Sequence, residues 1–317
     1  MSQLPFEDEN HMVMFLPDTE TSPRYSKTVE THPGTPREAE APPPLPKENW
    51  QCPRKWPFYE YRVMWREYFA EFFGMWVFMT LGQGTSATTT FLTAKFPNQQ
   101  AAAGEVLVMF GWGLAVTMGL FVSMGVSGGH LNPSVTFANC LFGTMPWRKF
   151  PGYVFAQTLG AFTAAMCMYL LFYGRFKDAK RALAPGETMT LKYGGIFCTY
   201  PHESNAVCVW NEFLDTTILL FCIMGIFDSH MTPADTYKPV AVGLLIITIA
   251  VSIGINSAFG MNPARDLGPR IASALIFRTT DPFTLFDYYF WIPTLVPPFG
   301  AAFGMFLYTI FIIPGKK

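Results

Sequence analysis

Two short motifs, 130 residues apart, constrain the fold of this chain more than any other feature. Asn132-Pro133-Ser134 and Asn262-Pro263-Ala264 each follow a long apolar segment. Asn is a favoured helix N-cap and Pro is favoured at the first helical position, so each motif predicts the start of a helix. The first helix would run from Pro133 to Phe142, about ten residues or ~15 Å, which is half of a ~30 Å hydrocarbon core. We therefore expect two half-helices that face each other inside a membrane and line a pore.

The composition favours a membrane protein over a soluble enzyme. Of the 317 residues, 50% are hydrophobic and only 14% are charged, and the net charge is −1. No Lys/Arg-rich run is present to follow a phosphate backbone, so nucleic acid is not an expected partner. The five histidines are scattered and no nucleophile stands at motif spacing from a base, which argues against an enzyme. No cofactor or metal is implied.

The chain divides into an N-terminal tail and a channel domain. Residues 1–60 are Pro-rich and acidic, and such a segment is expected to be disordered because it cannot bury enough apolar surface. Ser22-Pro23 and Thr35-Pro36 in this tail are either phosphorylation sites that regulate the channel or incidental pairs. Residues 61–317 form the predicted channel domain, which contains six apolar stretches near the ~20 residues that a span needs. These stretches are about 66–92, 104–126, 150–174, 210–228, 238–256 and 287–313.

The two halves of the channel domain repeat one another. Glu71-Phe72 opens the first span and Glu212-Phe213 the fourth, while Gly113 and Gly243, again 130 residues apart, lie in the second and fifth. Because three spans form each repeat, the second copy enters the membrane from the opposite side. We expect a first repeat at about 66–174, a polar loop outside the bilayer at 175–209 and an inverted second repeat at about 210–313. The distribution of Lys and Arg weakly favours cytoplasmic N- and C-termini.

The cysteines do not form a metal-binding pattern. None of the six has CxxC spacing, and three of them fall in predicted helices, where a thiol is usually a small packing group. Cys198 and Cys208 share the long loop and would be able to pair if that loop were extracellular. Two free thiols are the favoured interpretation.

At the two motifs the chain resembles a known family. Ser127-Gly-Gly-His-Leu-Asn132-Pro-Ser-Val135 and Phe259-Gly-Met-Asn262-Pro-Ala-Arg-Asp-Leu-Gly-Pro-Arg270 are similar to the two signature loops of the aquaporins, and the second is closest to the glycerol-conducting branch, the aquaglyceroporins. The similarity covers about residues 66–313. It implies an all-α membrane protein with six transmembrane helices and two re-entrant half-helices in an inverted repeat. It also implies a homotetramer with one pore per subunit, embedded in a lipid bilayer.

Elementary electrostatics supports a role for the motif residues. A helix N-terminus carries roughly +0.5 charge, so two that converge at mid-membrane repel cations and orient a passing oxygen. The side-chain amides of Asn132 and Asn262 would donate to that oxygen while their carbonyl groups cap the helices. Arg265 at this depth costs about 2.5–3.5 kcal/mol and is expected to face pore water.

The resemblance assigns further residues to the pore. Trp112, Ala250 and Phe259 would form the selectivity filter with Arg265; aromatic rings would contact the CH groups of a polyol, and the small Ala250 would leave room for it. Asp266 is the residue typical of the glycerol branch at its position. Other assignments concern the loops before the half-helices: pore-lining residues Gly128, Gly129, His130, Ser257 and Ala258, and supporting residues Glu71, Glu212 and Asp266. A proton relay is the alternative role for the two glutamates.

The expected function is passive conduction of glycerol, other small uncharged polyols and water, with protons and ions excluded. We expect an integral, multi-pass membrane protein and favour the plasma membrane, although the sequence itself does not identify the membrane. Three alternatives remain open at this point: a strictly water-selective channel, an ion-coupled secondary transporter, which also uses inverted repeats, and a non-conducting scaffold.

Overall fold

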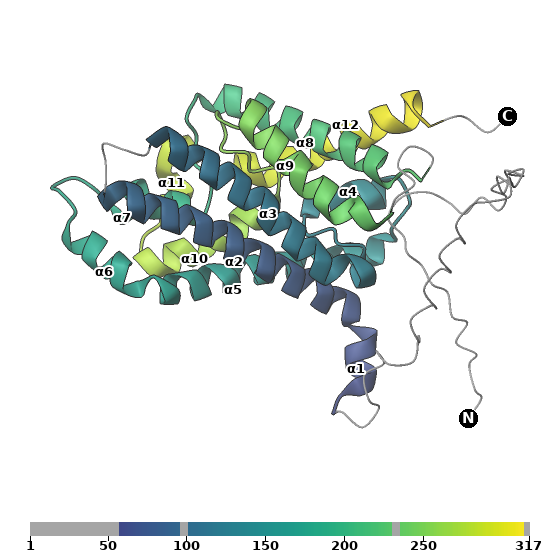
Figure 1. Ribbon diagram of the computed structural model, residues 1–317, viewed down its shortest axis with the longest axis horizontal. Helices are drawn as coiled ribbons and strands as arrows, with labels where there is room; N and C mark the ends of the chain where they lie inside the picture. The colour runs from purple at the N-terminus through teal and green to yellow at the C-terminus, as the bar shows by residue number, and fades with distance from the viewer. Residues whose placement is uncertain (1–56, 96–100, 230–234, 314–317) are drawn as a thin grey trace, which may run out of the picture. The chain divides into compact units, whose positions relative to one another are not determined.

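The computed structural model describes residues 57–95, 101–229 and 235–313 (Figure 1). The predicted tail, including Ser22 and Thr35, lies outside the described residues except for its last four. A short helix, α1 (Tyr59–Met64), belongs to a separate structural unit. The described residues from Arg66 onward belong to one unit, which contains every other helix of the described residues.

Six long helices dominate this unit, and the described residues contain no β-strand. Four of the helices are long and apolar enough to cross a membrane: Gly104–Ser127, Trp147–Leu171, Asn205–Phe227 and Trp291–Phe311. The 16-residue α9 is apolar but shorter, and the 30-residue α2 carries Glu67, Glu71 and Gln83 among its apolar residues. The six are α2 (Arg66–Lys95), α3 (Ala101–Ser127), α5 (Phe150–Leu171), α8 (Asn205–Phe227), α9 (Lys238–Ile253) and α12 (Trp291–Phe311).

Two shorter helices begin at the motif prolines. The first, α4 (Pro133–Leu141), has 9 residues and the second, α10 (Pro263–Phe277), has 15. Asn132 and Asn262 are their N-caps in extended backbone conformation, with Pro at the first helical position of each. Together with the six long helices they form the predicted fold class, which is confirmed: an all-α membrane fold with two half-helices.

The helices pack as two copies of one arrangement that exchange their half-helices. In the first copy α2 contacts α3 and α5, and in the second α8 contacts α9 and α12 (Figure 1). The half-helix of each copy packs on the other, because α4 contacts α12 while α10 contacts α5. The copies also meet where α3 crosses α9: a Cβ on Gly113 would lie 2.6 Å from the carbonyl oxygen of Gly243, and one on Gly243 would lie 2.7 Å from that of Gly113. Glycine at this repeated position permits the close crossing.

The segment between the repeats, predicted as a polar loop, contains short helices and a buried turn. It holds α6 (Tyr173–Arg181), α7 (Met189–Tyr193) and the 3-10 helix η3 (Gly194–Ile196). Phe197, which follows η3, is fully buried and stacks on Phe176 of α6 with ring centroids 5.6 Å apart. The aromatic contact therefore folds this segment back onto the helices. The remaining elements are η2 (Trp147–Lys149), η4 (Asp235–Tyr237) and α11 (Asp281–Tyr288), whose helix is broken at residues 285–287.

Cys198 and Cys208 are free thiols in the structure. The Sγ of Cys198 donates to the carbonyl oxygen of Gly194, whereas the Sγ of Cys208 donates to that of Asn256. Their different partners are consistent with the favoured interpretation of two unpaired thiols.

Candidate functional site: a cavity at the meeting point of the half-helices

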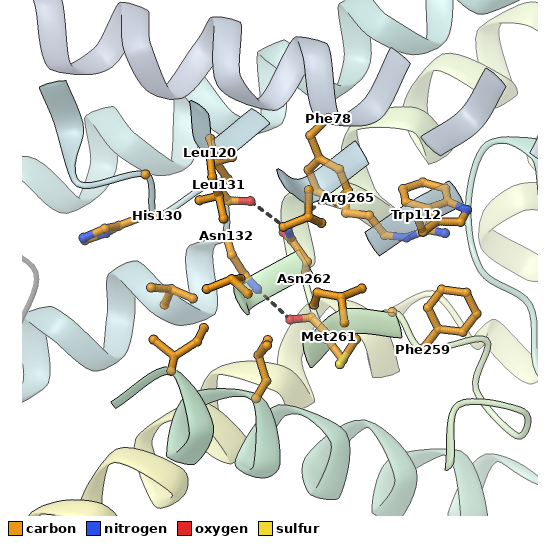
Figure 2. Close-up of a pocket in the computed structure, with 18 of the residues that line it drawn as sticks. Phe78, Trp112, Leu120, His130, Leu131, Asn132, Phe259, Met261, Asn262 and Arg265 are labelled. Atoms are coloured by element: carbon orange, nitrogen blue, oxygen red, sulfur yellow. Dashed lines mark hydrogen bonds between the residues drawn. The ribbon is translucent and has the colours of Figure 1, made fainter. Parts of the chain in front are cut away.

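The two asparagines tie the half-helices together. The Oδ1 of Asn132 accepts a hydrogen bond from the backbone N–H of Ser134 at 2.8 Å, and that of Asn262 accepts from Ala264 and Arg265 at 3.1 and 3.2 Å. Each amide Nδ2 donates across the junction: Asn132 to the carbonyl of Met261 at 2.9 Å and Asn262 to that of Leu131 at 2.7 Å (Figure 2). An amide has two N–H groups, so each asparagine retains one donor after this bond.

A cavity of about 70 Å³ lies at this junction. On the same measure one water molecule needs ~10–15 Å³, so the cavity has room for several. Its lining includes Trp112 and Arg265, the two asparagines, and Phe227 at the end of α8. In Figure 2 the rings of Trp112 and Phe259 lie at one end of the group and His130 at the other, with the asparagines between them.

One end of the cavity combines a guanidinium group with aromatic rings. The Cζ of Arg265 lies 4.1 Å from the ring centroid of Trp112, within cation–π distance. The indole N–H of Trp112 donates to the Oγ of Ser86 at 3.0 Å, and its ring meets Phe78 edge to face. These contacts fix the indole plane, so Arg265 lies over a rigid ring. Arg265 is only 5% exposed, and its remaining donors are available to a solute in the cavity.

The buried turn after η3 supplies a carbonyl oxygen to this end. The oxygen of Phe197 accepts from the Nη1 of Arg265 at 3.5 Å and from the Nε2 of Gln83 at 3.3 Å. Neither Phe197 nor Gln83 was identified from the sequence. The polar composition of the segment around Phe197 gives no indication that this residue is buried. Gln83 was detectable in principle, because a polar side chain in an apolar helix such as α2 needs a hydrogen-bond partner.

Two buried glutamates hold the loops that precede the half-helices. The carboxyl oxygens of Glu71 accept from the backbone N–H groups of His130 and Leu131 at 2.9 and 2.7 Å. Those of Glu212 accept from Gly260 and Met261 at 2.9 and 2.7 Å. Both glutamates are fully buried. Each glutamate therefore binds two backbone amides of one loop, while the carbonyl oxygens of Leu131 and Met261 accept from the asparagine amides.

Asp266 forms an ion pair inside the protein with Arg270, one helical turn further on. The Nη2 of Arg270 lies 2.7 Å from the Oδ2 of Asp266 and donates to the carbonyl of Thr199 at 2.6 Å. Asp266 in turn accepts from the backbone N–H of Thr199 at 2.8 Å. The pair ties α10 to the turn that carries Phe197. Arg265, in contrast, points to the cavity rather than to Asp266.

The cavity brings together some of the predicted pore residues and not others. Of the predicted set, its lining includes Trp112, Gly129, His130, Asn132, Phe259, Asn262 and Arg265, and does not include Gly128, Ala250, Ser257 or Ala258. Ala250 is buried on α9, two turns beyond Val242 and one beyond Ile246, both of which line the cavity. His130 is also buried, and its Nδ1 lies 3.1 Å from the Oγ1 of Thr136.

An apolar wall of the cavity was missed by sequence reasoning. It is formed by Phe78, Val116, Leu120, Val135, Leu219, Ile223, Phe227, Val242 and Ile246. The signal was present as i, i+4 spacing: Leu219, Ile223 and Phe227 follow one face of α8. In a hydrophobic span that spacing does not distinguish a pore wall from a helix contact. The cavity lining therefore combines these apolar side chains with the donors and carbonyl groups described above.

The fold and the cavity together define a class of protein: an all-helical membrane protein of two inverted repeats, whose half-helices meet tip to tip beside a cavity. Comparison with known families agrees. Residues 59–308 match the model of the major intrinsic protein family. The chain therefore belongs to the major intrinsic protein family.

Individual relatives are similar over most of the chain. It is 42% identical to a protein named aquaglyceroporin-3 from Trypanosoma brucei brucei, with 83% of each chain covered. It is 38% identical to aquaporin-9 of Mus musculus, with 78% of this chain and 82% of the relative covered. The solved structure of the aquaglyceroporin from Plasmodium falciparum is similar at a TM-score of 0.67 and 31% identity, and covers 78% of this chain and 96% of its own. These findings support a channel for glycerol and water and do not favour the alternative functions.

Proposed function

We propose that this protein conducts glycerol, other small uncharged polyols and water passively through the cavity, and excludes protons and ions. The observation that carries the proposal is the position of the Arg265 guanidinium 4.1 Å from the Trp112 ring centroid at one end of the cavity. A polyol presents hydroxyls along one edge and CH groups along the other. The guanidinium and the Phe197 carbonyl suit the hydroxyls, and the rings of Trp112 and Phe259 suit the CH groups.

The proposed exclusion of ions rests on fixed positive potential. The N-termini of α4 and α10 meet at the asparagines, and each carries about half a positive charge. Arg265 adds a full charge at the filter end. A cation entering the cavity would lose water without gaining compensating anionic groups, whereas a neutral solute would replace its lost hydrogen bonds with those of the lining.

Flux measurements on the purified protein test this proposal. Vesicles containing it should shrink and reswell in a glycerol gradient, with little saturation and no dependence on a proton or sodium gradient. Water flux without glycerol flux would instead establish a water-selective channel. Saturable uptake that requires an ion gradient would establish a transporter, and absence of both fluxes a scaffold.

Arg265→Ala tests the filter within the same assay. Loss of the cation should lower the barrier to cations and produce a proton leak that the wild type lacks, while the ratio of glycerol to water permeability falls. Arg148→Ala is the matched control, because Arg148 is exposed just before α5. A filter role for Arg265 is excluded if both variants behave as the wild type does.

We also propose a homotetramer in the plasma membrane with both termini cytoplasmic. Large exposed apolar side chains along the long helices, such as Leu114, Phe121 and Leu244, support contact with lipid or with neighbouring subunits. The mass of the detergent-solubilised particle tests the tetramer. Accessibility of tags placed at each end, in intact and permeabilised cells, tests the orientation.

A further inference from the structure

A chain of hydrogen bonds connects a surface ion pair to the loop that lines the cavity. At the end of the unit where α2 and α5 begin, the Nζ of Lys149 lies 2.8 Å from the Oε2 of Glu67, and their side chains are 33% and 32% exposed. The same Oε2 lies 3.0 Å from the hydroxyl of Tyr153. That hydroxyl also lies 3.0 Å from the carbonyl oxygen of Ser127. Tyr153 is only 3% exposed and therefore connects the surface to the interior.

The chain continues from Ser127 into the cavity lining. Ser127 donates its hydroxyl hydrogen to Glu71 at 2.6 Å, and its Oγ accepts from the backbone N–H of Gly129 at 3.2 Å. Glu71 holds His130 and Leu131 through their backbone amides. A displacement of the Ser127 carbonyl is therefore transmitted to the residues that line the cavity.

The Tyr153 hydroxyl cannot donate fully to both of its neighbours. It has one hydrogen, while the Glu67 carboxylate and the Ser127 carbonyl are both acceptors. Lys149 affects one of these two acceptors, because its ammonium donates to both carboxyl oxygens of Glu67, at 2.9 and 2.8 Å. A carboxylate already satisfied by an ammonium attracts the tyrosine hydrogen less. The hydrogen is then left for Ser127.

The described residues of the second repeat contain the inner part of this arrangement, with no ion pair at the corresponding place. The hydroxyl of Tyr289 donates to the carbonyl of Ser257 at 3.0 Å, and Ser257 occupies the place of Ser127. The residue that corresponds to Glu67, at the offset that relates Glu71 to Glu212, is the uncharged Cys208. The Lys149–Glu67 ion pair is therefore linked to the loop of the first repeat and has no counterpart at Cys208.

We propose that Lys149 is a positioning residue: by holding Glu67 it leaves the Tyr153 hydrogen to the Ser127 carbonyl, fixes the loop of residues 128–131 and thereby sets the permeability to glycerol. The inference rests on the proposed conduction of glycerol and water. Glycerol needs several aligned acceptors at once, whereas water needs fewer, so a displaced loop lowers glycerol flux more than water flux. The ratio of the two permeabilities is therefore the measure of this role, and it does not depend on how much protein is active.

The test compares variants of the full chain in vesicles. Lys149→Met should lower the glycerol-to-water ratio by about threefold, because an unpaired Glu67 then takes the tyrosine hydrogen. Adding Glu67→Ala to Lys149→Met should restore the ratio to within about twofold of wild type, because no competitor remains. Tyr153→Phe should lower the ratio at least as much as Lys149→Met. Adding Lys149→Met to Tyr153→Phe should have no further effect, since both act through one hydroxyl.

Tyr289→Phe supplies the matched control, because this tyrosine supports the loop of the other repeat. Its effect on the ratio and that of Lys149→Met should multiply. An unchanged ratio in Lys149→Met, or a lowered ratio that Glu67→Ala does not restore, overturns the inference while glycerol conduction by the wild type stands. Absence of glycerol flux through the wild type overturns the proposed function itself.

Discussion

The loops that precede the two half-helices have similar backbones made from different residues. In the first repeat Gly128 and Gly129 adopt positive φ values of 86° and 65°. At the matching positions, 130 residues later, Ala258 and Phe259 adopt φ values of 60° and 42°. Glycine adopts this region without strain, whereas a residue with a Cβ is held there at a cost of order 1–3 kcal/mol. The second repeat therefore carries strain that the first avoids.

The strained position lies at the end of the cavity that holds Trp112 and Arg265. A glycine in place of Phe259 would present no ring at this end, where Phe259 lines the cavity together with Trp112 and Phe78. Glu212 opposes the strain by binding the two amides that follow Phe259. The loop that presents an aromatic ring to the cavity is therefore the one whose backbone is held at positive φ without glycine.

The two half-helices also differ in buried charged side chains. Asp266 and Arg270 form a buried ion pair on α10, while the matching residues on α4 are the uncharged Thr136 and Cys140. The pair anchors the turn that supplies the Phe197 carbonyl to Arg265. In the first repeat, Thr136 instead contacts His130 and Gln157 within the bundle. The buried ion pair therefore lies in the repeat whose half-helix is tied to the turn that carries Phe197.

The largest expected effect is loss of that ion pair. Arg270→Met would leave Asp266 buried without its cation, which destabilises a protein by about 3–5 kcal/mol. We expect a large fall in the midpoint of thermal unfolding in detergent. Cys140→Ala at the matching position should change the midpoint far less, by the loss of one small buried group. Combining Arg270→Met with Asp266→Asn should recover part of the loss, and failure to recover any of it contradicts the account of an uncompensated charge.

The next effect distinguishes the two supporting glutamates. Glu71 accepts hydrogen bonds from Ser127 and Gln157 as well as from two backbone amides. A Gln side chain replaces one acceptor with a donor that faces other donors, at about 1–3 kcal/mol for each buried group left unsatisfied. Glu71→Gln should therefore lower the unfolding midpoint more than Glu212→Gln does. Equal shifts would mean that the additional partners of Glu71 contribute nothing.

Sequence reasoning located the elements that depend on local chemistry. The Asn-Pro motifs predicted the starts of α4 and α10 to the residue, because capping and proline geometry act within one turn. The six apolar stretches predicted the long helices, although α8 begins at Asn205 rather than near residue 210.

Contacts that depend on distant segments were not predictable in this way. Phe197 lies in a segment of polar composition, and its burial follows from aromatic contacts with Phe176 and Phe277. The alignment of Lys149, Glu67 and Tyr153 likewise depends on how α2 packs on α5. The sequence pattern of one segment does not predict such a contact, because the contact depends on how two distant segments pack together.

The smallest effect tests the strain directly through two opposite substitutions. Gly129→Ala places a Cβ at φ 65°, 3.1 Å from the Cα of Met124, and should cost about 1–2 kcal/mol of unfolding free energy. Ala258→Gly relieves strain in the folded state but also gives the unfolded chain more freedom, about 0.4–1 kcal/mol in the opposite sense. We therefore expect only a slight change in unfolding midpoint for Ala258→Gly and a clear fall for Gly129→Ala. A rise of several degrees in the unfolding midpoint of Ala258→Gly would show that the loop before α10 stores strain that its surroundings do not offset. The difference in strain between the two repeats would then be larger than their contacts alone indicate.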